Sequence, residues 1–135
     1  MLSTETQTIE LDVAPAIVFD ILADPRRIPE WASAFADRVS EDPPHGWQVT
    51  KGDDRFAIRM VAFPQSGTVD YLRQIAPGRE AGAYIRVLPK STDGSVVVMT
   101  LPVPPGTDSQ RVRATLRDEL AALGALARAA GQAAH

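Results

Sequence analysis

Tyr71 and Arg73, together with Thr100, are the side chains best suited to chemistry in this sequence. Tyr71 and Arg73 lie two residues apart in the run GTVDYLRQIA, and Thr100 belongs to the later apolar run SVVVMTLPV. Alternate residues of a strand share one face, so we expect all three on the face that carries the apolar side chains. A guanidinium enclosed there would meet a carboxylate, a phenolate or a carbonyl of a ligand.

Arg73 also has an interpretation that needs no ligand. Burying an unpaired arginine costs on the order of several kcal/mol, so the side chain would instead lie near a strand end, reach water, or pair with Asp37 or Glu30. Tyr71 and Thr100 are residue types that often satisfy their hydrogen bonds within a core. The residues alone leave both interpretations open.

The remaining chemistry-bearing residues form no recognisable catalytic set. His45 follows two prolines in a turn, where a lone histidine is usually solvated. The chain has no cysteine and only two histidines, which excludes disulfides, thiolate nucleophiles, cysteine-based zinc sites and an all-histidine metal site. No Ser-His-Asp set, phosphate loop or metal-ligand spacing occurs. The sequence therefore predicts no metal or cofactor and leaves enzymatic activity open.

Length and charge limit the function classes further. The chain has 135 residues, which predicts a single domain over residues 1–135. The net charge is -3 without a cluster of Lys and Arg, so nothing indicates a nucleic-acid partner. The start, MLSTETQTIELDV, has no basic flank and no apolar run, and no later stretch is apolar enough to span a membrane. A cytoplasmic location is expected.

The first third of the chain predicts one strand and two short helices. Residues 6–13 alternate apolar and polar, which is typical of a half-buried strand. Pro15 suits the first position of a helix, and Asp24-Pro25 ends it, because a residue before proline avoids the helical region. A second helical piece is expected over residues 28–35.

Residues 37–101 predict a meander of antiparallel hairpins. Short apolar runs alternate with turn signals: Pro43-Pro44-His45-Gly46, Lys51-Gly52-Asp53-Asp54, Pro64-Gln65-Ser66-Gly67, Pro77-Gly78 and Ser91-Thr92-Asp93-Gly94. After the prolines of residues 102–105, an Ala- and Leu-rich run predicts a long helix with Thr107, Asp108 or Ser109 as its N-cap. An apolar stripe along this helix, which holds Val112, Leu116, Leu120, Leu123, Ala127 and Ala130, needs the sheet to cover it.

If each hairpin closes symmetrically, the turns also predict the register and the two faces of the sheet. Val69 then lies opposite Val87, Tyr71 opposite Ile85, and Arg73 opposite Ala83. The face toward the helix collects Trp47, Val49, Phe56, Ile58, Met60, Val69, Tyr71, Ile75, Ile85, Val87 and Val98, with Arg73 and Thr100 among them. A bulge in one strand would invert the assignments of that strand.

The opposite face is expected to carry both charges and apolar groups. Asp70 is predicted opposite Arg86 there. Its apolar members are predicted to be Val61, Phe63, Leu72, Tyr84, Leu88, Val97, Met99 and Leu101. This is more apolar area than a solvated face requires, so a homodimer formed back to back is one hypothesis.

The order of these elements resembles the START-like, or SRPBCC, superfamily, which includes polyketide cyclase/dehydrase-like proteins. The matching residues are TIELDV, VFDILADP, IPEW, GTVDYL, AYIRVLP and the Leu-rich C-terminal helix, so the resemblance covers residues 8–124. It implies an α+β helix-grip fold, in which a curved antiparallel sheet of about six to seven strands wraps around the long C-terminal helix. Two short helices follow the first strand, and Trp31 would pack at the end of the cavity.

The resemblance implies a cavity between sheet and helix that binds lipids, polyketides or isoprenoid-like molecules. The predicted polar contacts are Tyr71, Arg73 and Thr100. The predicted lining is Trp47, Phe56, Ile58, Met60, Ile85, Val98, Leu116, Leu120 and Leu123. The alternatives are a polyketide cyclase/dehydrase-like enzyme, in which Arg73 and Tyr71 polarise a carbonyl, and a homodimeric interaction protein with no ligand.

Overall fold

The computed structural model describes residues 3–91 and 93–134, and it confirms the α+β helix-grip architecture. The strands are β1 (Ser3–Leu11), β2 (Arg38–Glu41), β3 (Trp47–Lys51), β4 (Asp54–Phe63), β5 (Thr68–Ala76), β6 (Arg79–Ser91) and β7 (Gly94–Val103). The helices are α1 (Pro15–Leu22), α2 (Ile28–Trp31) and α3 (Ser109–Ala133), with single turns of 3-10 helix at Pro25–Arg27 and Pro64–Ser66.

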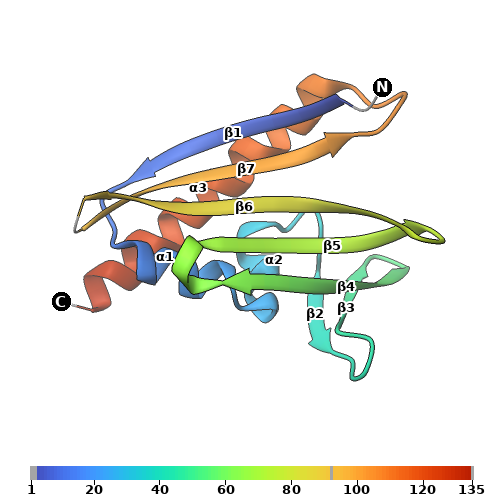
Figure 1. The fold of residues 1–135 in the computed structure, drawn as a ribbon, viewed down its shortest axis with the longest axis horizontal. Coiled ribbons are helices and arrows are strands. Elements are labelled where there is room, and N and C mark those ends of the chain that lie inside the picture. The colour runs from blue at the N-terminus through green and yellow to red at the C-terminus, as the bar shows by residue number, and fades with distance from the viewer. Residues whose placement is uncertain (1–2, 92, 135) are drawn as a thin grey trace.

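The seven strands form one antiparallel sheet in the order β1-β7-β6-β5-β4-β3-β2. Each strand from β2 to β7 pairs with the next one along the chain, and β1 pairs with β7, so the first and the last strand are neighbours at one edge of the sheet. The long helix α3 runs behind the sheet, where it packs chiefly against β1 and also against α1, α2 and β7 (Figure 1). One face of the sheet therefore holds all three helices.

The local signals that begin and end the helices act as predicted. Pro15 opens α1. The carboxylate of Asp24 accepts a hydrogen bond of 3.1 Å from the backbone N–H of Arg26, which caps the 3-10 turn before α2. The N-cap of α3 is Asp108, whose carboxylate accepts from the N–H of Gln110 at 2.9 Å. The second helix is shorter than the predicted residues 28–35, because the backbone leaves the helical region at Ala32.

The middle of α3 packs directly on the sheet. Leu116, Leu120 and Leu123 are at most 2% exposed and belong to the main core. A Cβ atom added at Gly124 would lie 3.2 Å from Leu11 Cδ2, so the small residue there allows close approach. The three leucines were predicted to line a cavity, but they are not among the residues that line the pocket described below.

The β5–β6 hairpin has a register that differs by two residues from the predicted one. Tyr71 lies opposite Ala83 and Arg73 opposite Ala81, with a β-bulge between Gln74 and Ala76. A shift of two preserves the faces, so Tyr71 and Arg73 remain on the helix side. Asp70 is opposite Tyr84 rather than Arg86, although its carboxylate still contacts the Arg86 guanidinium at 2.8 Å.

Strand β7 has the opposite orientation to the predicted one. Val97 and Met99 are fully buried toward the helices, whereas Val98 and Thr100 face away from them. The Thr100 hydroxyl shares a 2.8 Å hydrogen bond with that of Thr6 on the exposed side of β1. The cause is a register irregularity between Pro89 and Ser91 at the β6–β7 turn, which shifts the alternation by one residue.

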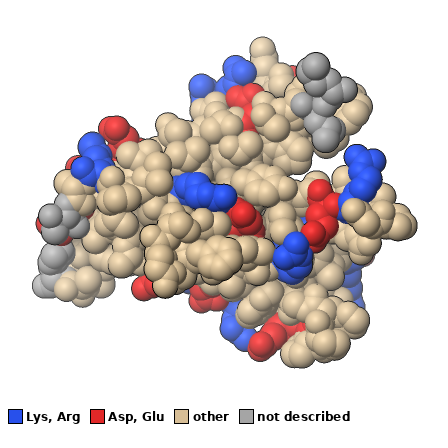
Figure 2. All heavy atoms as spheres, in the orientation of Figure 1, with Lys and Arg blue, Asp and Glu red and all other residues tan. Residues whose placement is uncertain are grey.

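The outer face of the sheet carries charged side chains of both signs between uncharged areas (Figure 2). Phe63, Tyr84 and Leu88 are 55%, 41% and 42% exposed. Val97, Met99 and Leu101 were predicted on this face, but β7 turns them inward and turns Val98 outward. Within residues 3–91 and 93–134, no helix is long and apolar enough to cross a membrane.

Candidate ligand pocket

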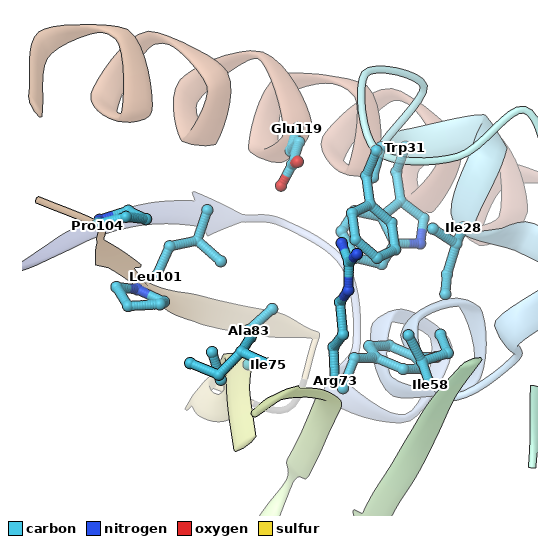
Figure 3. Close-up of a pocket in the computed structure, with 15 residues that line it drawn as sticks. Ile28, Trp31, Ile58, Arg73, Ile75, Ala83, Leu101, Pro104 and Glu119 are labelled. Carbon is cyan, nitrogen blue, oxygen red and sulfur yellow. The ribbon is translucent and has the colours of Figure 1, made fainter. Parts of the chain in front are cut away.

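A pocket of about 390 Å³ lies between α2, α3, the β5–β6 hairpin and the end of β7 (Figure 3). Its lining is mostly apolar. The residues that line it are Ile28, Trp31, Ala32, Phe35, Ile58, Tyr71, Arg73, Ile75, Ala81, Gly82, Ala83, Leu101, Pro102, Pro104 and Glu119. Small side chains on β6 leave space for the pocket. The helices and the prolines at and after the end of β7 form its other walls.

Arg73 stands on the pocket wall near the end of β5, with its guanidinium over the ring of Phe56 at 3.9 Å from the ring centre. Phe35 meets the same ring edge-on, with 5.4 Å between ring centres. The residue is exposed, so the cation is solvated as well as stacked on an aromatic face. Figure 3 shows the side chain rising from the sheet toward the helices.

The ion pairs predicted as alternatives for Arg73 do not form. Asp37 pairs with Lys51 at 3.1 Å, and Glu30 pairs with Arg27 at 2.8 Å. No carboxylate in the described part of the chain lies within ion-pair distance of Arg73. Its hydrogen-bond donors are therefore available to a ligand.

Tyr71 lines the pocket as a buried residue whose hydroxyl is already used. The side chain is 5% exposed, and its hydroxyl donates a hydrogen bond to the carbonyl of Leu22 at the end of α1. Burial raises the pKa of the phenol, and the nearby charge of Asp24 adds to this effect. The hydroxyl thus joins the sheet to α1, and only its oxygen lone pairs remain for a ligand.

Glu119 is the polar group that sequence reasoning missed. It lies on α3, is 8% exposed, and has no hydrogen-bond or ion-pair partner among the described residues. Burial raises the pKa of this carboxyl to about 7, with a smaller contribution from the charge of Asp118. Near neutral pH such a group both accepts and donates a proton, which is what general acid–base chemistry requires.

The sequence did hold a signal for Glu119. It lies three residues after Leu116 and four before Leu123, so it falls on the apolar stripe of the predicted C-terminal helix. A glutamate inside such a stripe is either forced to the surface or buried for a reason. The structure shows it buried at the pocket wall.

The structure separates the predicted ligand contacts into three groups. Ile58, Tyr71 and Arg73 line the pocket, and Phe56 supports Arg73 from beneath. Five residues pack in or against the core away from the pocket lining, namely Met60, Ile85, Leu116, Leu120 and Leu123, and Trp47 packs at its edge beneath Arg26. Val98 and Thr100 are on the outer face, as described above.

Two further observations concern the chemistry of the pocket. The indole Nε1 of Trp31 is buried without a hydrogen-bond partner. Among the residues that the structure describes, no group of three His, Cys, Asp or Glu side chains is placed to hold a metal ion. Besides the apolar walls, the polar groups that remain for a ligand are therefore Arg73, Glu119 and the lone pairs of the Tyr71 hydroxyl.

A family model identifies the family of this chain, and solved structures share its fold. A family model described as polyketide cyclase / dehydrase and lipid transport matches residues 4–132. A comparison with curated proteins gave no match. A START superfamily protein from Mycobacterium smegmatis is 12% identical, with a TM-score of 0.72 over 93% of this chain and 97% of the other.

Two aromatase/cyclase structures are similar at the same level. The Zhui aromatase/cyclase from a Streptomyces species is 15% identical, with a TM-score of 0.65 over 100% of this chain and 97% of the other. The di-domain ARO/CYC BexL is 17% identical, with a TM-score of 0.68 over 90% of this chain and 45% of that larger chain. At these identities the likeness concerns the fold.

Proposed function

The chain belongs to the polyketide cyclase/dehydrase and lipid transport family, and from this premise we propose that it binds a small apolar or aromatic molecule in the pocket beneath α2 and α3. Family membership and the START-like fold support a ligand-binding or cyclase-like role. The observation that carries the finer proposal is the contrast within the pocket, whose walls are apolar apart from a few polar groups.

The position of Arg73 indicates how such a ligand would be oriented. The guanidinium is at the exposed end of the pocket and is not neutralised by a carboxylate of the described chain. A ligand with an apolar body and a carboxylate, phenolate or carbonyl at one end would place that end at Arg73 and its body against Trp31, Ile58 and Ala83.

Titration with 2-naphthoate tests this orientation. The Arg73→Ala variant should bind this anion roughly tenfold more weakly, because a charge-assisted hydrogen bond contributes about 1.5 kcal/mol. Isothermal titration calorimetry measures the affinity, with Arg55→Ala as a matched variant on exposed β4 outside the pocket lining. Unchanged affinity in Arg73→Ala would show that the arginine is not the anchor.

A second candidate function is a cyclase-like reaction, which the buried carboxyl of Glu119 favours. Ionised Glu119 would take an α-proton from a ketone of the substrate, the resulting enolate would attack a second carbonyl polarised by Arg73, and the alkoxide would take the proton back. With a poly-β-ketone substrate, Glu119→Gln should lower kcat by about a hundredfold while 2-naphthoate affinity stays within twofold. Turnover that persists after loss of both Arg73 and Glu119 would exclude this function.

A further inference from the structure

We propose that Glu119 selects the ligand: its protonated carboxyl donates a hydrogen bond to an uncharged acceptor, such as a ketone oxygen, at the inner end of the bound molecule. This inference rests on the proposed function, because it assumes that a small molecule enters the pocket. It adds a second polar contact to the one at Arg73, with a different preference. Arg73 suits an anion at the exposed end, whereas Glu119 suits a neutral acceptor inside.

The geometry separates the two groups. Glu119 descends from α3 into the pocket, between the side of Trp31 and Arg73 and the side of Leu101 and Pro104 (Figure 3). It is 8% exposed, whereas Arg73 is exposed. A ligand whose charged end reaches Arg73 would therefore present a different part of its skeleton to Glu119.

The chemistry of an unpartnered buried carboxyl determines what it accepts. A polar group in an apolar pocket gains most from a ligand that completes its hydrogen bonds. A neutral carboxyl offers one O–H donor, which a ketone oxygen matches, while a ligand carboxylate placed there would bring a second acceptor and an unpaired charge. Glu119 should therefore favour ketones and disfavour anions at that position.

The charged groups on the surrounding elements leave Glu119 without an ion-pair partner. Asp118 on α3 itself is acidic, and Glu30 on α2 is paired with Arg27. On β5 the neighbours at the pocket are Tyr71 and Arg73, and Arg73 lies within ion-pair distance of no carboxylate of the described residues. The end of β7 and the residue after it contribute Leu101, Pro102 and Pro104. On β1, Glu5 is paired with Arg113. The burial that raises the pKa of Glu119 to about 7 is thus uncompensated, and the donor form is present below that pH.

Glu119 also borders a second pocket, through which we expect a proton to reach the carboxyl while the ligand is bound. A second, smaller pocket of about 140 Å³ lies beside α2 and α3, with Glu30, Ser33, Ala34, Thr115, Asp118 and Ala122 in its lining. Trp31 and Glu119 line both pockets, so they form the partition between them. The polar lining of the smaller pocket admits water to the carboxyl from the side that the ligand does not fill.

Two probes of the same shape test the proposal: 2-acetylnaphthalene, which carries a ketone oxygen, and 2-isopropenylnaphthalene, which has a methylene group in its place. Equilibrium dialysis gives both dissociation constants at about pH 6 and about pH 8.5. For the unmodified protein we expect the ketone to bind about fivefold more tightly than the alkene at the lower pH, the size of one net hydrogen bond. This preference should fall about fivefold at the higher pH, where the carboxylate has lost its donor.

Two variants separate hydrogen bonding from shape. Glu119→Gln keeps an N–H donor that does not titrate, so its preference for the ketone should persist at both pH values. Glu119→Leu has no donor at this position, so its preference for the ketone should be about fivefold smaller than that of Glu119→Gln at both pH values. If the unmodified protein binds both probes with equal affinity at each pH, the inference is wrong and the proposed function stands. If neither probe binds at either pH, the proposed function is wrong as well.

Discussion

Replacing Ala83 with phenylalanine should abolish binding of 2-naphthoate while the protein remains folded. Ala83 lies on β6 opposite Tyr71, and its small side chain lines the pocket. A phenyl ring there would occupy the space that the aromatic body of the ligand needs. Because burial of a large apolar group contributes about 3 kcal/mol, its loss corresponds to roughly a hundredfold weaker affinity, measured by calorimetry.

The matched control for this variant is Ala57→Phe. Ala57 lies on β4 next to the pocket residue Ile58, but it is exposed and outside the pocket lining. The same added volume there should leave the affinity within twofold, and urea denaturation should show that both variants unfold cooperatively. If Ala83→Phe binds 2-naphthoate as well as the unmodified protein does, the pocket beneath α2 and α3 is not the binding site.

Much of the fold was predictable because its signals are local. Pro15 and Asp24-Pro25 set the ends of the first helix, Asp108 caps the last one, and the turns at Gly52 and Gly67 adopt the positive φ angles that suit glycine. The order of these elements identified the superfamily, which the family match confirms. Each signal acts within a few residues, so one sequence is enough to reveal it.

The predicted strand register gave the correct face of a strand only where its error was an even number of residues. The β5–β6 hairpin has a bulge near Gln74 and shifts by two residues, so Tyr71 and Arg73 kept their predicted face. The β6–β7 turn shifts the alternation by one, which moved Thr100 and Val98 to the outer face and brought Leu101 to the pocket. Counting turn residues does not distinguish these two cases, because both depend on the backbone conformation at the turn.

The position of the pocket could not be predicted from the sequence, for a different reason. The Ala-rich helix α3 lies close to the sheet at Gly124, where an added Cβ atom would be 3.2 Å from Leu11 Cδ2. The cavity lies instead where β6 presents Ala81, Gly82 and Ala83 and where Trp31 and Phe35 cover it. This choice depends on how segments distant in sequence meet, whereas the periodicity of one helix reports only its own buried face.

Ionisation of Glu119 should make the folded protein less stable as the pH rises. The pKa of Glu119 is about 7 in the folded protein and 4.5 in the ordinary reference state. The folded state therefore holds the proton more tightly, so the contribution of this group to stability is most favourable below about pH 4.5. It declines as pH rises to about 7 and is constant above, with a total loss of roughly 3 kcal/mol.

Glu119→Gln removes this loss, because its amide does not ionise. Relative to the unmodified protein, the variant should gain up to roughly 3 kcal/mol in unfolding free energy between about pH 4.5 and pH 8, measured by urea denaturation. For the Glu30→Gln variant, the change in unfolding free energy should have the opposite sign. The pairing of Glu30 with Arg27 lowers its pKa, so its stabilisation exists at neutral pH and is lost as the solution is acidified. A stability difference for Glu119→Gln that does not change with pH would mean that Glu119 is ionised in the folded protein, and the ketone preference proposed above would then lose its donor.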